Sequence, residues 1–128
     1  MNLFDWLLLG HLFGDWLVQG ERMAIVKPTD RRVRLLHALI WTACVSASLG
    51  AWALGHRVPH SPAFVIAALL VLGVVHFWWD GRLPVLLWRR YVSRAADPAQ
   101  PQWVVFVHDQ VWHVLQLAVV ALLLTNGR

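Results

Sequence analysis

Four long apolar runs constrain the fold of this chain more than any other feature. They cover residues 3 to 20, 33 to 55, 62 to 82 and 102 to 125. Each approaches the length of about 20 residues that a helix needs to cross roughly 30 Å of hydrocarbon. Backbone polar groups inside a bilayer must bond within their own segment, so such runs form helices. The sequence therefore predicts an all-α integral membrane protein with four transmembrane helices.

The composition supports a membrane environment. Hydrophobic residues make up 59% of the 128 residues, charged residues only 14%, and nine residues are tryptophan. A soluble domain of this size has too little interior to bury so much apolar side chain. We expect a single transmembrane domain over residues 1 to 128. Its one cysteine, Cys44, excludes an intrachain disulfide.

The segments between the runs predict the topology. Pro28 and the polar residues after it indicate a loop between the first and second runs, and GHRVPHS is a short turn between the second and third. Between the third and fourth runs, RLPVLLWRRYV mixes arginines with large apolar residues, which favours a helix lying in the membrane interface. AADPAQP follows as a polar turn. The expected architecture is an up-down-up-down bundle with an interfacial helix before its last span.

The basic residues predict the orientation. The two segments after the first and third runs share one face of the membrane and hold nine Lys or Arg residues, against two on the opposite face. The positive-inside rule places the richer face in the cytoplasm, so for a protein of the cytoplasmic (inner) membrane both termini are predicted outside the cytoplasm. The nine are Arg22, Lys27, Arg31, Arg32, Arg34, Arg82, Arg89, Arg90 and Arg94; the two are Arg57 and Arg128.

The distribution of Lys and Arg residues also indicates which partners the protein binds. The net charge of +4 does not indicate nucleic acid, because the cations gather beside apolar runs instead of forming a groove-binding face. Membrane lipids are the expected partners. A four-helix protein of this size has little room for an aqueous pathway of its own, which favours a homo-oligomer or a larger membrane complex.

Histidine and aspartate recur inside or at the ends of the apolar runs. Three pairs stand four residues apart, a spacing that puts both side chains on one helix face. In the expected topology these pairs and His37 all lie in the cytoplasmic half of the bundle. The pairs are His11 with Asp15, His76 with Asp80, and Asp109 with His113. His108 is rotated about 100° from Asp109 around the helix, so we expect it at the interface instead.

Such a set predicts a metal site. Imidazole and carboxylate are ligands for Zn, Mn or Fe. Ionisable residues inside a membrane are energetically costly, so their presence there indicates a function. The predicted ligands are His11, Asp15, His37, His76, Asp80, Asp109 and His113. An unligated carboxylate, Asp15 or Asp109, would act as general base on metal-bound water in hydrolysis of a lipid or lipid-linked substrate. Gln19, Lys27 and Gln110 are predicted to support or bind the substrate or cofactor.

Other interpretations remain open at this level. The His and Asp side chains could form interhelical hydrogen bonds that only hold the bundle together, or a metal-free proton relay in a non-catalytic subunit of a larger complex or transport module. Paired membrane histidines can also ligate haem, although the adjacent aspartates argue against it. Lys27 could anchor the chain to anionic headgroups or recognise a phosphate.

Several short motifs together resemble a known family. HLFGDWLVQ, Met23 and Ala24 with Lys27, LLHALIW, HFWWD and HDQVWH occur in this order along nearly the whole chain. The pattern is similar to that of small bacterial multi-pass membrane proteins catalogued as domain of unknown function 3307. The resemblance implies a membrane protein of no established activity. It covers His11, Asp15, Gln19, Lys27, His37, His76, Asp80, Asp109, Gln110 and His113, and departs from the family in Trp78, Trp79 and the Gly81–Arg82 step.

Overall fold

The computed structural model describes residues 1–94 and 102–126, and all its regular elements are helical. In chain order these are α1 (Leu3–Leu12), the π-helical turn η1 (Phe13–Leu17), α2 (Glu21–Val26), α3 (Arg31–Ala53), α4 (Pro62–Trp79), α5 (Leu83–Tyr91) and α6 (Gln102–Thr125). The predicted turn AADPAQP, at residues 95–101, lies outside the described residues. The expectation of an all-α chain is confirmed for the described ranges.

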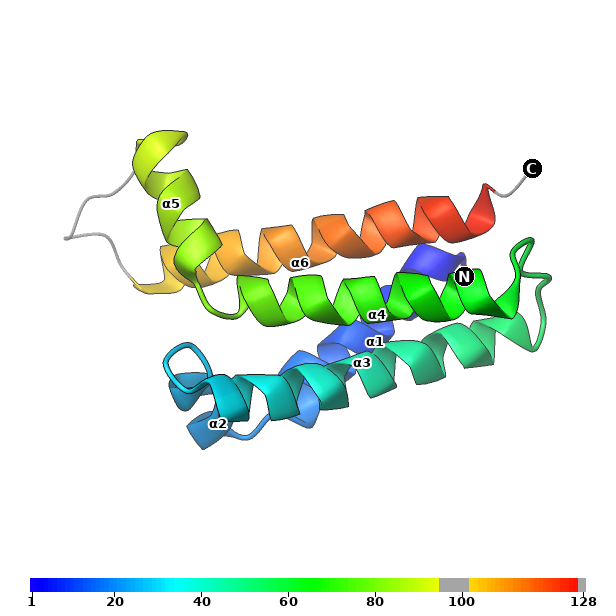
Figure 1. Ribbon diagram of the computed structural model, residues 1–128, viewed down its shortest axis with the longest axis horizontal. Helices are drawn as coiled ribbons and strands as arrows, with labels where there is room; N and C mark the ends of the chain where they lie inside the picture. The colour runs from blue at the N-terminus through cyan, green and yellow to red at the C-terminus, as the bar shows by residue number, and fades with distance from the viewer. Residues whose placement is uncertain (95–101, 127–128) are drawn as a thin grey trace.

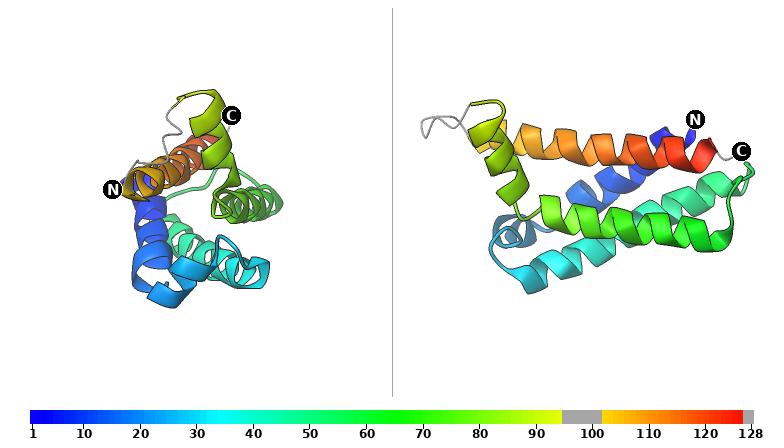
Figure 2. Two further views of the ribbon diagram at one scale, coloured as in Figure 1. Left: turned by 90° about the vertical axis from the view of Figure 1, so that its left-hand side faces the viewer. Right: turned by 45° about the horizontal axis from the view of Figure 1, so that its top comes forward.

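Four long segments form the body of the molecule. The segment α1 packs against α3 and α6, and α4 packs against the same two helices. Figure 1 shows both termini at one end of this bundle and α2 and α5 at the other. Figure 2 shows the long helices arranged around a common axis. The arrangement brings segments distant in sequence to one interior.

Among the described residues, three helices are long and apolar enough to cross a membrane. They are Arg31–Ala53, Pro62–Trp79 and Trp103–Thr125, close to the last three predicted spans. The helix α3 begins earlier than the predicted start of its span because Asp30 caps it, accepting hydrogen bonds from the backbone N–H groups of Arg32 and Val33. The first predicted span is shorter: α1 ends at Leu12 and continues only as η1 to Leu17.

The segments that connect the long helices agree in part with the predicted loops and interfacial helix. The chain turns at Lys27 to Asp30, around Pro28, as predicted, but a short helix, α2, precedes this turn. The predicted interfacial segment is the helix α5, which starts after Arg82 in a left-handed backbone conformation with φ 59°. This conformation turns the chain away from α4, so α5 lies across the end of the bundle (Figure 1).

The interior divides into an apolar half and a polar half. Toward the termini, the core holds Leu3, Leu7, Val45, Leu49, Leu72, Leu117 and Leu124. Toward α2 and α5, it holds the buried polar residues His11, Asp15, Lys27, His37, His76, Asp80, Asp109 and His113. Trp41 is fully buried where the halves meet.

Two glycines allow α1 and η1 to lie close against α3. A Cβ added at Gly10 would stand 2.8 Å from the Val45 Cα, and one at Gly14 would stand 3.0 Å from the Trp41 Cα. Both neighbours are backbone atoms, which cannot swing away. The spacing Gly10–xxx–Gly14 is the small-residue motif that permits close helix packing in membranes.

Replacing Gly10 with alanine is therefore expected to destabilise the fold by about 1 to 3 kcal/mol, because α1 must move away from α3. Gly50 is a matched control, since it lies within α3 with no heavy atom within 4 Å of an added Cβ. Gly50→Ala should leave stability equal or raised, as alanine favours helix. Thermal unfolding of the two variants in detergent measures the difference, and equal midpoints would contradict the close-packing argument.

Candidate metal centre

The polar half of the bundle converges on the imidazole of His37, which α3 carries about two turns after its cap at Asp30. The ring is fully buried. Its Nε2 lies 2.8 Å from Asp15 Oδ1, 3.1 Å from His76 Nε2 and 3.3 Å from Asp80 Oδ2. Lys27 Nζ is a fourth neighbour at 3.1 Å. One imidazole nitrogen has a single proton or lone pair, which is too little to serve four polar atoms.

Different elements deliver these atoms. Asp15 comes from the π-helical turn η1, whose wider backbone is a frequent feature of functional sites. His76 lies in the last turn of α4, and Asp80 is the C-cap residue of the same helix. Lys27 reaches in from the turn after α2 and is only 8% exposed. Their convergence depends on tertiary packing.

Two groups of three side chains have spacings suited to a metal ion. They are Asp15 with His37 and His76, and His76 with Asp80 and His113; all five residues are buried. In the first group the contacts are 2.8, 3.1 and 3.7 Å. Atoms bound at about 2.1 Å around one tetrahedral ion lie roughly 3.4 Å apart, so these side chains need little movement to share an ion.

His113 has the tautomer that a metal ligand requires. Its Nδ1 lies 2.7 Å from the backbone oxygen of Asp109, and a carbonyl can only accept, so Nδ1 carries the proton. In the neutral ring the other nitrogen, Nε2, then presents a lone pair; this atom lies 3.6 Å from Asp80 Oδ1 and has no hydrogen-bond partner among the described residues. Histidines that bind metals commonly donate their second N–H to a backbone carbonyl in this way.

Asp80 has a central place in the cluster because its two oxygens face different neighbours. Oδ1 lies 2.9 Å from Lys27 Nζ. Oδ2 lies 3.3 Å from both His37 Nε2 and His76 Nε2. The carboxylate thus contacts the buried ammonium on one side and the imidazole pair on the other.

Trp41 closes the apolar side of the cluster. Its indole stacks on the His76 ring, with centroids 3.8 Å apart and planes 7° from parallel. Its Nε1–H donates to His11 Nδ1 at 2.9 Å. Trp41 therefore orients two imidazoles while separating them from the apolar core.

The remaining predicted residues lie around the cluster. His11 belongs to neither group of three, and both its ring nitrogens have hydrogen-bond partners, Nδ1 with Trp41 and Nε2 with Gln110. Asp109 is also outside both groups and lines a polar pocket of about 80 Å³ with Gln19, Lys27, Arg82 and Gln110. His108 bonds back to Val104 and is only half-buried, which agrees with its expected place outside the cluster.

Sequence reasoning missed two contributors. Trp41 stands four residues after His37, so the helical spacing already placed it on the same face of α3. Arg82 was counted only as a basic loop residue, and no local pattern indicates that it lines the polar pocket. The burial of Lys27 inside the cluster also exceeds what its loop position suggested.

No curated protein and no solved structure matches this chain. The family described as "Protein of unknown function (DUF3307)" matches residues 3–127, nearly the full length. The match confirms the resemblance seen in the sequence motifs. Its description names no activity, so the chemistry must be argued from the cluster itself. The chain belongs to the DUF3307 family.

Proposed function

We propose that the buried cluster binds one divalent metal ion, such as Zn, Mn or Fe, and that the protein is a metal-dependent hydrolase of lipid or lipid-linked substrates. The observation that carries the proposal is the convergence of His76, Asp15 and Asp80 within 3.3 Å of His37 Nε2, beside the unpartnered Nε2 of His113. Mixed imidazole and carboxylate ligands suit these three metals.

Charge balance supports a bound cation. The cluster and its pocket hold the carboxylates of Asp15, Asp80 and Asp109 and the cationic groups of Lys27 and Arg82. With ionised carboxylates and neutral imidazoles, these groups sum to one uncompensated negative charge. Unpaired buried charge is costly, and a bound cation would compensate it.

We also propose a fourth span formed by α1 and η1, which gives an up-down-up-down topology. The support is the packing of α1 and η1 against α3 in the body of the bundle. The positive-inside pattern then puts the metal centre near the cytoplasmic face of a bacterial inner membrane, with both termini outside the cytoplasm and α5 in the interface.

The geometry favours Asp109 over Asp15 as general base. Asp15 belongs to a group suited to hold the metal, whereas Asp109 lies outside both groups and lines the pocket. A bound metal ion would lower the pKa of a water molecule toward about 7. Asp109 would accept its proton as the water oxygen bonds to the ester carbonyl carbon, and would return that proton to the alcohol oxygen when the ester C–O bond breaks.

The test combines metal analysis with a conservative variant. Purified protein should contain about one equivalent of divalent metal, and in nanodiscs of phosphatidylethanolamine and phosphatidylglycerol it should release fatty acid. Asp109→Asn should keep the metal and lower the release rate by roughly 10²- to 10⁴-fold, as expected for loss of a general base.

Two results would contradict this assignment. Absence of bound metal from the wild-type protein after metal supplementation would reject the proposed metal centre. Ester hydrolysis by Asp109→Asn at the wild-type rate would be compatible with a metal centre but would reject Asp109 as its general base.

A second candidate function, a metal-free proton or ion network in a non-catalytic membrane subunit, is favoured by one observation. Lys27 supplies a cation inside the cluster, 2.9 Å from Asp80 and 3.8 Å from Asp15. An internal ammonium can hold these carboxylates without a metal. This function predicts metal-free protein that copurifies with a stoichiometric membrane partner.

A further inference from the structure

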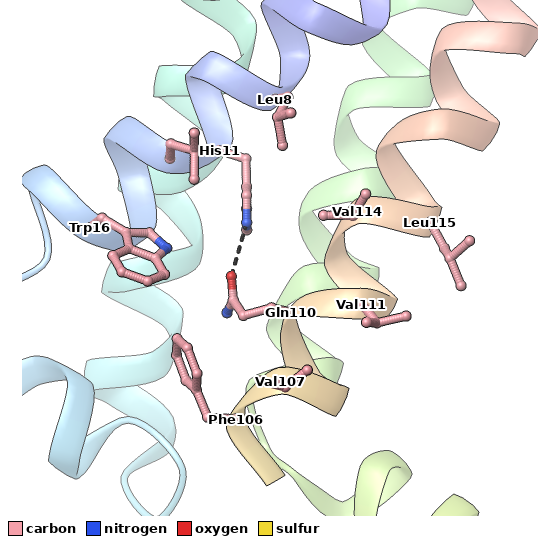
Figure 3. Close-up of a pocket in the computed structure, with 10 residues that line it drawn as sticks. Leu8, His11, Trp16, Phe106, Val107, Gln110, Val111, Val114 and Leu115 are labelled. Atoms are coloured by element: carbon pink, nitrogen blue, oxygen red, sulfur yellow. Dashed lines mark hydrogen bonds between the residues drawn. The ribbon is translucent and has the colours of Figure 1, made fainter. Parts of the chain in front are cut away.

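An apolar groove runs along the outside of the bundle between α1 and α6. It encloses about 420 Å³, within the range of roughly 300 to 1,000 Å³ typical of ligand pockets. Figure 3 shows side chains that line it, which include Leu8, Trp16, Phe106, Val107, Val111 and Leu115. Among its lining residues, His11 and Gln110 are the polar ones besides the indole of Trp16. In a bilayer this groove faces hydrocarbon.

The groove adjoins the polar pocket beside the candidate metal centre. Trp16, Phe106 and Gln110 line both cavities. The rings of Trp16 and Phe106 meet edge to face, with centroids 5.7 Å apart, on one side of this junction (Figure 3). Beyond it lie the cations Lys27 and Arg82 and the carboxylate of Asp109, which is only 9% exposed. Asp109 Oδ1 has no hydrogen-bond partner among the described residues.

A directed chain of hydrogen bonds sets the orientation of Gln110 at the junction. The Trp41 indole can only donate, so His11 Nδ1 is an acceptor and the proton of the neutral His11 ring is on Nε2. His11 Nε2 must then donate to Gln110 Oε1, 3.2 Å away (Figure 3). The amide NH₂ of Gln110 is left to face other groups, and it can only donate.

From these features we infer that the groove binds one acyl chain of a glycerophospholipid, and that Gln110 donates its amide N–H to an ester oxygen of that lipid at the inner end of the groove. The inference deepens the proposed function and rests on it for the reaction at the ester, whereas the binding itself needs no turnover. The anionic phosphate of the same lipid would lie toward Lys27 and Arg82.

The chemistry of the junction favours a lipid over a second copy of this chain. A phospholipid presents hydrocarbon, then ester oxygens, then an anionic phosphate. The groove presents apolar side chains and the amide of Gln110, and the pocket that shares Gln110 presents the cations Lys27 and Arg82 beside the carboxylates of Asp15, Asp80 and Asp109. A lipid-facing helix from another copy would place apolar side chains against the donors of Gln110, which would leave them unpaired at a cost.

The experiment uses full-length protein in nanodiscs containing phosphatidylglycerol with a diazirine on one acyl chain. Photolabelled residues are mapped by mass spectrometry, and bound metal is measured for each variant. Val111→Trp fills the groove, and Val119→Trp is its matched control on α6, since the two valines are 50% and 55% exposed and Val119 does not line the groove. Gln110→Glu keeps the acceptor for His11 and removes the donor.

Wild-type labels should concentrate on residues 8–16 and 106–115. Val111→Trp and Gln110→Glu should each lower this labelling by about tenfold, which corresponds to roughly 1.4 kcal/mol, while Val119→Trp leaves it unchanged. Labels spread evenly over the bundle, or unaffected by Val111→Trp, would overturn the inference. So would loss of a dimer in Val111→Trp alone, because the groove would then be an interface between copies.

Metal content separates this inference from the proposed function. Localised labelling in a protein without metal would support the lipid groove and reject the metal centre. Unlocalised labelling in a metal-loaded protein would do the opposite.

Discussion

Replacing His113 with glutamine is expected to weaken divalent metal binding by more than about 100-fold, since loss of a direct ligand should exceed the roughly 10- to 100-fold effect of losing an outer hydrogen-bond partner. His113 is fully buried and directs an unpaired Nε2 lone pair at Asp80. Glutamine has a similar length but cannot place a ring nitrogen there. Metal content after equilibrium dialysis against buffered Zn²⁺ or Mn²⁺ measures the effect.

His108 provides the matched control for this prediction. It lies on the same helix five residues earlier, bonds to its own backbone at Val104 and is half-buried outside the cluster. His108→Gln should therefore bind metal as the wild type does. Equal metal binding by both variants would contradict the ligand assignment of His113, and circular dichroism checks that both remain helical.

Replacing Lys27 with methionine is expected to destabilise the metal-free protein by about 3 to 5 kcal/mol, the cost of leaving a buried charge without its partner. Lys27 Nζ contacts Asp80 Oδ1 at 2.9 Å, and Asp15 lies nearby at 3.8 Å. Without the ammonium these carboxylates repel one another in a buried site. A divalent cation would restore the missing positive charge, so added metal should stabilise this variant more than it stabilises the wild type.

Arg22 is the matched control, because it is an exposed cation on α2 and near Lys27 in sequence. Arg22→Met should change stability by no more than about 0.5 kcal/mol, as is usual for surface positions. Thermal unfolding in detergent, first with a chelator and then with metal, compares the two variants. Lys27→Met as stable as Arg22→Met under chelation would show that the ammonium does not hold the cluster together.

Much of the helical framework could be predicted from local sequence. The last three apolar runs correspond to α3, α4 and α6 within a few residues, because uninterrupted apolar length is a local property. The first run departs more from its predicted span, because His11, Asp15, Gly10 and Gly14 interrupt it. Its close approach to α3 depends on Trp41 and Val45, which lie about 30 residues later.

The candidate site could be predicted only in outline. The i,i+4 spacing put Asp109 with His113 and His76 with Asp80, and it separated His108 from them, because helical rotation follows directly from sequence position. The spacing could not show that His37, which has no i,i+4 partner, lies nearer the centre of the cluster than His11, which is paired with Asp15. Hydrogen bonds to Trp41 and Gln110 occupy His11, while four ionisable side chains surround His37.

The sequence alone thus determined which residues are apolar enough to form helices and which polar residues share a face of each helix. Only the tertiary structure decided which atoms meet: that Lys27 turns inward, that Trp41 orders two imidazoles, and that Gln110 presents its donors where groove and pocket join. The physical reason is that hydrogen-bond direction and ionic contact depend on partners from other helices, whose relative rotation and depth are set by packing of the whole bundle.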